Sequence, residues 1–73
     1  MSKSRAKLLH QHRREIKRGA RPRFAVALER REVLALPWLE FDGARPDEVA
    51  EAARRAIACE LGVRADQVEV EPT

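Results

Sequence analysis

In the longer, C-terminal part of the chain, the spacing of apolar residues predicts two strands, a helix and a third strand. Apolar side chains alternate with other residues over 24–28, which is typical of a half-buried strand. The charged residues 29–32 follow as a turn, and a second strand covers residues 33–41. Residues 67–71 alternate again, so we expect a third strand that ends at Pro72.

The second predicted strand has apolar residues on both faces and contains Pro37. Proline has no N–H for the hydrogen-bond ladder, so it is tolerated only at a sheet edge or a bulge. We interpret Pro37 and Trp38 as a bulge, because one extra residue there turns Trp38 outward. The bulge leaves four apolar residues together on the opposite face: Leu34, Leu36, Leu39 and Phe41.

The helix predicted over residues 46–61 has start and stop signals at its two ends. Pro46 suits the first helical position, the next two residues are acidic as the helix dipole favours, and Gly62 provides the stop. Glu60 falls inside the apolar stripe, where it either extends into water past the sheet or marks a site. Cys59, beside the stripe, is expected to be a buried small residue. The stripe itself comprises Val49, Ala50, Ala53, Ala56, Ile57 and Leu61.

These elements predict an α+β fold in which one helix packs on a three-stranded sheet. The helical connection is long enough to make the second and third strands parallel neighbours. The other sheet face is then bare unless an N-terminal helix or a second subunit covers it, and Val33 and Trp38 are the residues expected there. A chain of 73 residues has room for only a small core. We therefore expect a homodimer.

A further, basic helix is predicted over residues 2–18. Ser2 or Ser4 serves as its cap, and Gly19 stands where a left-handed stop is needed. The apolar stripe of this helix is thin, so we expect the helix to become ordered on a partner. Residues 19–22 are interpreted as a hinge, because proline disfavours helix in the residue before it.

Charge divides the chain in two. The net charge is +3, but residues 1–23 carry nine basic residues and one acid, whereas residues 24–73 carry six basic and eleven acidic residues. Such asymmetry is typical of a basic arm for a polyanion, joined to a domain whose fold does not depend on the arm. We divide the chain into a basic arm with its hinge, 1–22, and a compact ββαβ domain, 23–73. The nine residues expected to contact phosphates are Lys3, Arg5, Lys7, Arg13, Arg14, Lys17, Arg18, Arg21 and Arg23.

Side chains for catalysis or metal binding are sparse. His10 and His12 are the only histidines, and a spacing of two places them on different sides of a helix, so no metal site is expected. The chain has no glycine-rich phosphate loop and no Ser/His/Asp set, so we expect no enzyme activity and no cofactor. A lone Cys59 indicates a reducing, cytoplasmic location, and no apolar run has the length of a membrane span.

Part of the chain resembles the HicB-like antitoxin core, in which two strands joined by a turn precede an Ala-rich amphipathic helix. The resemblance covers about half the chain and rests on residues 24–28, the segment Pro37-Trp38-Leu39, Gly43 and the helix residues 47–53. It implies a dimer whose acidic domain masks a basic ribonuclease toxin.

The sequence leaves two functions open. The first is a small non-enzymatic nucleic-acid-associated binding or regulatory protein, whose basic arm contacts phosphates of DNA or RNA while the domain dimerises or contacts a protein. The alternative is an antitoxin-like interaction module or inhibitor, whose acidic domain binds a partner protein. In a third arrangement, the arm folds onto the acidic residues Asp66, Glu69 and Glu71 of its own domain or of a neighbouring subunit. The residues expected to contact a protein are Val33, Trp38, Asp66, Glu69 and Glu71.

Overall fold

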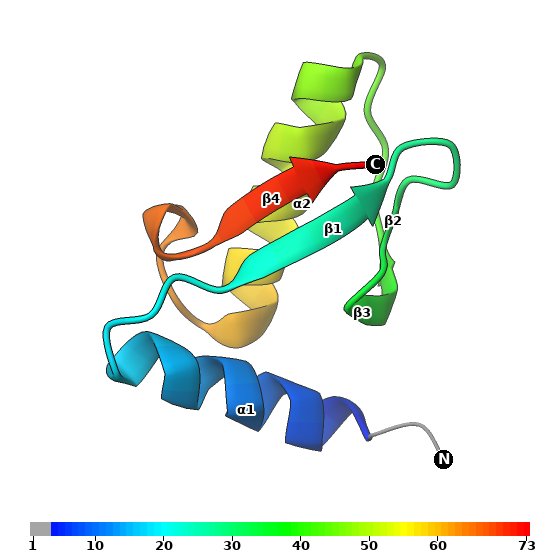
Figure 1. Ribbon diagram of the computed structural model, residues 1–73. Helices are drawn as coiled ribbons and strands as arrows, with labels where there is room; N and C mark the ends of the chain where they lie inside the picture. Colours follow the sequence, from blue (N-terminus) through cyan, green and yellow to red (C-terminus); the bar gives the residue numbers. More distant parts are fainter. Residues whose placement is uncertain (1–3) are drawn as a thin grey trace.

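The computed structural model describes residues 4–73 and has two α-helices and a four-stranded sheet (Figure 1). The elements in chain order are α1 (Arg5–Lys17), β1 (Arg23–Ala27), β2 (Glu32–Val33), β3 (Leu36–Glu40), α2 (Pro46–Leu61), a 3-10 turn (Ala65–Gln67) and β4 (Glu69–Pro72). The α+β class is confirmed. The sheet has four strands, so the predicted count of three is wrong.

The strand that we predict over residues 33–41 is a tight hairpin formed by β2 and β3. Val33 of β2 pairs with Leu36 of β3, so the chain reverses at Leu34 and Ala35. Leu34 donates its N–H to the carbonyl oxygen of Ala25 at 2.9 Å, and its side chain is 54% exposed at the tip. The prediction fails here because the reversal uses none of the residues that usually signal a turn.

The irregularity predicted at Pro37 and Trp38 lies inside β3. Glu32 pairs with Glu40, whereas the next residue of β2 pairs with Leu36, so residues 37–39 have no partner in β2. β3 is an edge strand, which tolerates a proline because the outer side of an edge needs no N–H donor. Trp38 is not turned outward into solvent. Its ring is half-buried and packs against the core.

The sheet order is β3-β2-β1-β4, with β1 parallel to β4 and the other neighbours antiparallel. The chain therefore leaves the sheet at one edge, passes through α2, and returns at the opposite edge. The predicted second and third strands are not neighbours. The unpredicted hairpin explains this difference, because β2 separates β3 from β1 and leaves the far side of β1 free for β4.

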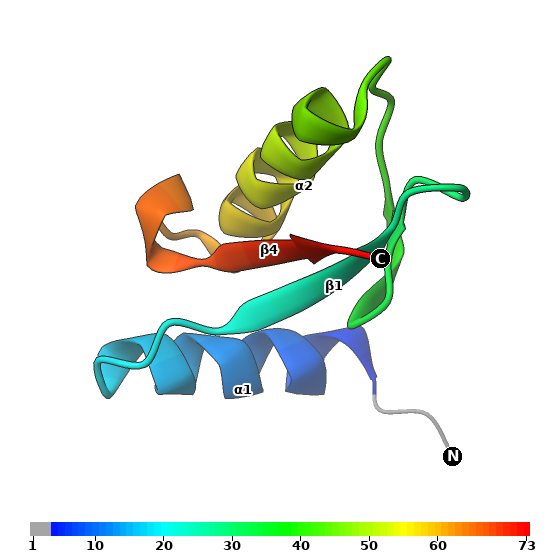
Figure 2. The same ribbon diagram turned by 45° about the horizontal axis from the view of Figure 1, so that its top comes forward.

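The core lies between the sheet and α2, which covers one sheet face (Figure 2). Gly62 ends α2 in the left-handed conformation, with φ of 71°, as predicted. Val33, expected on a bare face, is completely buried instead. The core residues are Phe24, Val26, Val33, Leu36, Val49, Ala53, Ile57, Ala58, Leu61 and Val68.

The outer side of α2 carries a cluster of one carboxylate and two guanidinium groups. Arg54 donates to Glu51 at 2.8 Å, and Arg55 lies 3.5 Å from the same carboxylate oxygen. The hydrogen bond from Arg54, together with the two positive charges, lowers the pKa of the Glu51 carboxyl. Because the pKa is lowered in the folded state, this cluster stabilises the fold at pH values above the ordinary pKa of glutamate. The stabilisation is lost as the pH falls through the lowered value.

We expect Arg54→Ala to raise the pKa of Glu51 towards the ordinary value, since the largest cause of the shift is removed. An NMR titration of the Glu51 side-chain carboxyl measures this directly. Arg30→Ala is the control, because Arg30 pairs with Glu32 in the β1–β2 turn. A Glu51 pKa that is unchanged by Arg54→Ala would show that the hydrogen bond is not formed in solution.

Candidate nucleic-acid interface

α1 begins and ends where its sequence signals predict. The Ser4 hydroxyl accepts a hydrogen bond from the N–H of Lys7 at 3.3 Å, and Gly19 follows the helix with φ of 87°. The alternative cap, Ser2, lies outside the described residues. α1 crosses the end of the two layers, where β1 begins and α2 ends (Figures 1 and 2).

The inner side of α1 packs on the domain. Leu8, Leu9 and Ile16 are half-buried and contact the core. His12 lies beside them: its ring centroid is 4.8 Å from that of Phe24, and its Nδ1 is 3.4 Å from a Glu15 carboxylate oxygen. The helix is therefore docked on its own domain, in contrast to the separate arm expected from the sequence.

Two arginines hold α1 to the C-terminal end of α2. Arg13 Nε donates to the carbonyl oxygen of Leu61 at 2.8 Å, and Arg13 Nη2 donates to that of Glu60 at 3.4 Å. The last carbonyl groups of a helix lack partners within it and attract cations, so these bonds are favourable. Arg5 forms an ion pair with the Glu60 carboxylate and lies over the Trp38 ring, 5.5 Å from its centroid.

These contacts assign a role to Glu60, for which the sequence leaves two interpretations. Its side chain is 20% exposed and is turned to Arg5, so it does not extend freely into water. The contacts also confirm part of the third arrangement considered from the sequence, because the arm folds onto its own domain. The acceptors are Glu60, which was not predicted, and Glu69 of the predicted acidic set, which pairs with Arg21 and Arg23.

The outer side of α1 carries a stripe of exposed basic residues, some of which also line a hollow beside Leu61 and Gln67 of the domain. At 100° per residue, the stripe occupies an arc of about 100°, centred opposite the packed side. Within the described part of the chain, none of these side chains forms an ion pair. We call this surface the basic stripe; its residues are Lys7, His10, Arg14, Lys17 and Arg18, all exposed.

The remaining arginines beyond α1 are nearly all neutralised. Among residues 19–73, only Arg45 has no carboxylate partner. The pairs are Arg21 and Arg23 with Glu69, Arg30 with Glu32, Arg31 with Asp42, Arg54 and Arg55 with Glu51, and Arg64 with Asp66. Unpaired positive charge on the described surface is therefore concentrated on the basic stripe.

The structure does not bring the predicted protein-contact residues together. Val33 is buried, and Trp38 lies beneath Arg5. Asp66 pairs with Arg64 at 3.2 Å in the 3-10 turn that precedes β4. Only Glu71, at the exposed end of β4, is free of an ion pair with another described residue.

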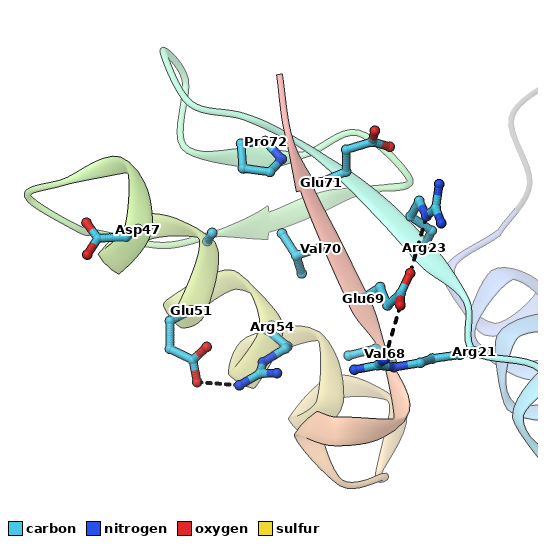
Figure 3. A pocket seen from close by; sticks show the side chains of 11 residues that line it. Arg21, Arg23, Asp47, Glu51, Arg54, Val68, Glu69, Val70, Glu71 and Pro72 are labelled. Carbon is cyan, nitrogen blue, oxygen red and sulfur yellow. Dashed lines mark hydrogen bonds and ion pairs between the residues drawn. The ribbon is translucent and has the colours of Figure 1, made fainter.

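An open groove lies between α2 and β4 (Figure 3). Val70 points towards α2, whereas the Glu69 and Glu71 carboxylates lie on the side of Arg23. The two nearby arginines are bonded to Glu69, at 3.1 Å from Arg21 and 3.3 Å from Arg23. The arginines of this groove are thus paired with carboxylates of the same chain, whereas Asp47 and Glu71 are not paired with another described residue. The basic stripe is therefore the stronger candidate site for an anion.

Other candidate chemistry is limited over residues 4–73. No group of three His, Cys, Asp or Glu side chains is placed to hold a metal ion there. Cys59 is exposed, so its predicted burial is wrong; it lies on the outer side of α2. No helix in this part of the chain combines the length and apolar character needed to cross a membrane.

Sequence reasoning missed the division of the basic residues into two groups. The helical period contains the signal, because it places Lys7, Arg14 and Arg18 opposite Leu9 and Ile16. His10 belongs to the stripe by the same criterion. Lys3 lies outside the described residues.

Comparisons with known proteins give no relatives for this chain. No family model matches it, and neither the curated proteins nor the solved structures contain a significant match.

Proposed function

We propose that this protein is a non-catalytic nucleic-acid-binding protein that contacts phosphates through the basic stripe of α1. The observation that supports the proposal is the concentration of unpaired cations on one exposed helix face. Cations at this density attract a polyanion and release its condensed counterions, which gives affinity without dependence on sequence. The domain holds the helix in place and presents this face.

Eight of the nine basic residues lie in the described part of the chain, and in this proposal they divide into those engaged by the domain and those free for phosphates. Arg5 and Arg13 fasten α1 to the domain, and Arg21 and Arg23 share Glu69. The four that remain for phosphates among the described residues are Lys7, Arg14, Lys17 and Arg18. Four neutralised phosphates correspond to a slope of about −3.6 in a plot of log affinity against log salt on duplex DNA. Nine would give a slope of about −8.

The test replaces those four residues together with glutamine. We expect the variant to lose at least about ten-fold in affinity at low salt, and most of its salt dependence, because the slope counts released counterions. Fluorescence anisotropy with labelled DNA and RNA, over a range of salt concentrations, measures both quantities.

The matched control removes the same number of charges elsewhere, through glutamine at Arg30, Arg31, Arg45 and Arg55. We expect its salt slope to remain near that of the unchanged protein. If the control variant loses as much affinity and salt dependence as the stripe variant, net charge alone governs binding and the stripe is not the site. If the unchanged protein binds no nucleic acid at low salt, the proposal is wrong.

The antitoxin-like alternative receives less support. Two of its three acidic residues, Asp66 and Glu69, are engaged by arginines of the same chain. A homodimer stays a prediction of the sequence: no described element covers the sheet face opposite α2 (Figure 1). The cytoplasmic location also stays a prediction.

A further inference from the structure

We infer that the ligand of the basic stripe is duplex DNA in the B form, with α1 lying in the major groove. This inference rests on the proposed function and names its substrate class. It follows from the shape of the stripe, the surroundings of α1 and the positions of the aromatic residues.

The stripe is carried by a regular helix at the boundary of the molecule. α1 forms one end of the fold in both views, and no described element lies beyond its outer side (Figures 1 and 2). A helix with its side chains is about 10–12 Å across. The major groove of B-DNA is about 12 Å wide and admits such a helix.

The arrangement of cations within the stripe suits a groove bounded by two phosphate rows. Lys17 lies at one margin of the arc, and Lys7 and Arg18 lie at the other. Arg14 lies between the margins, where a helix in a groove directs its side chain to the base edges. From Lys7 to Arg18 the stripe is about 16 Å long, at 1.5 Å per residue.

Single strands are disfavoured because the described surface has no freely exposed Phe or Trp ring for stacking, and the exposed ring of the stripe is the smaller imidazole of His10. Proteins that bind single-stranded nucleic acids stack bases on exposed aromatic side chains. The Phe and Trp residues of this chain are three, and all lie within the described range. Phe24 is completely buried, Phe41 packs against the core, and Trp38 lies beneath Arg5.

Double-stranded RNA is disfavoured by its groove. The major groove of an A-form helix is deep and narrow, and side chains on a helix do not reach into it. Proteins that bind double-stranded RNA instead contact the wide, shallow minor groove and the phosphates on either side of it. A single straight helix with a basic stripe of about 100° is too narrow to span that groove.

The contacts of α1 with the domain place the basic stripe far from the acidic N-terminus of α2. The bonds of Arg5 and Arg13 to Glu60 and Leu61 fix α1 at the C-terminal end of α2. The acidic N-terminus of α2, with Asp47 and Glu48, lies at the far end of that helix (Figure 1). A DNA duplex along the stripe is thus remote from these carboxylates.

The experiment compares four probes at one salt concentration by fluorescence anisotropy. They are a mixed-sequence 20-base-pair DNA duplex, the same duplex with bulky glucosyl groups in the major groove, an RNA duplex of the same sequence and single-stranded dT20. We expect the plain DNA duplex to bind at least ten-fold more tightly than each of the others. Netropsin, which fills the minor groove, is expected to leave the affinity of the protein for the plain DNA duplex unchanged.

A pair of single variants separates groove entry from charge. Of the two variants, Arg14→Gln is expected to lower the affinity for the plain duplex more. It is also expected to reduce the ratio between the affinities for the plain and the glucosylated duplex. Arg18→Gln removes the same charge at the margin and is expected to weaken both duplexes by a similar factor. Circular dichroism and the thermal midpoint of each variant show whether it is folded.

Equal or tighter binding of dT20 or of the RNA duplex overturns the inference and leaves the proposed function standing. Full affinity for the glucosylated duplex also overturns it. Failure to bind any of the four probes overturns both.

Discussion

Replacing Ile57 with alanine is expected to lower the free energy of unfolding by about 2–4 kcal/mol. Ile57 lies in the middle of the buried stripe of α2 and is completely inaccessible to solvent. The substitution removes apolar burial and leaves a cavity that the neighbouring strands fill only in part. Urea denaturation followed by far-UV circular dichroism gives the two unfolding free energies.

Arg55→Ala is the control for this substitution. It lies two residues away on the same helix, its side chain is 76% exposed, and its ion pair with Glu51 is a surface pair. We expect a change within about 0.5 kcal/mol, since exposed pairs contribute little. Equal losses for the two variants would mean that the helix has a different rotational position on the sheet.

Deleting residues 1–18 is expected to destabilise the domain by roughly 3 kcal/mol. Leu8, Leu9 and Ile16 lose their contacts with the core, and a half-buried aliphatic side chain contributes about 1 kcal/mol. The deletion also removes the Arg13 hydrogen bonds and uncovers the end of the core near Phe24. The same urea experiment on the shortened and complete chains measures the loss.

The four-glutamine stripe variant is the control for this deletion, because it removes charge while keeping the inner side of α1. Its unfolding free energy is expected to stay close to that of the unchanged protein. If the shortened chain is as stable as the complete one, α1 is not docked in solution. The basic segment then behaves as the separate arm that the charge pattern predicts.

The helices were predictable from the sequence because their signals are local. Pro46 and Gly62 mark the ends of α2, and Ser4 and Gly19 mark those of α1, each within a turn of the boundary. Such signals act through neighbouring backbone groups and need no tertiary context.

The sheet was less predictable because its pairing depends on contacts between distant residues. The reversal at Leu34 and Ala35 has no turn residue, so the hydrophobic pattern alone predicts one continuous strand there. The pairing of β4 with β1 joins residues 69–72 to residues 23–26, and nothing local specifies which strand β4 joins.

The candidate site was predicted as a basic segment, but its division into two groups was not. Arg5 and Lys17 look alike in the sequence, yet the first faces Glu60, 55 positions along the chain, and the second faces solvent. A count of charges cannot separate a cation that fastens a helix from one that is free for a ligand. The two kinds of cation are distinguished only by the groups that they contact in the folded protein.

The prolines at the two sheet edges affect how copies of this protein behave at high concentration. Glu69 and Thr73 donate their N–H groups towards β1, so the alternate positions of β4 face outward. Of these, Pro72 has no N–H, which leaves Val70 as the outward donor of the strand. At the opposite edge, Pro37 interrupts β3. Neither edge presents the row of amides that another strand needs for addition. Strand addition between neighbouring copies is therefore disfavoured at both edges, even at high local concentration.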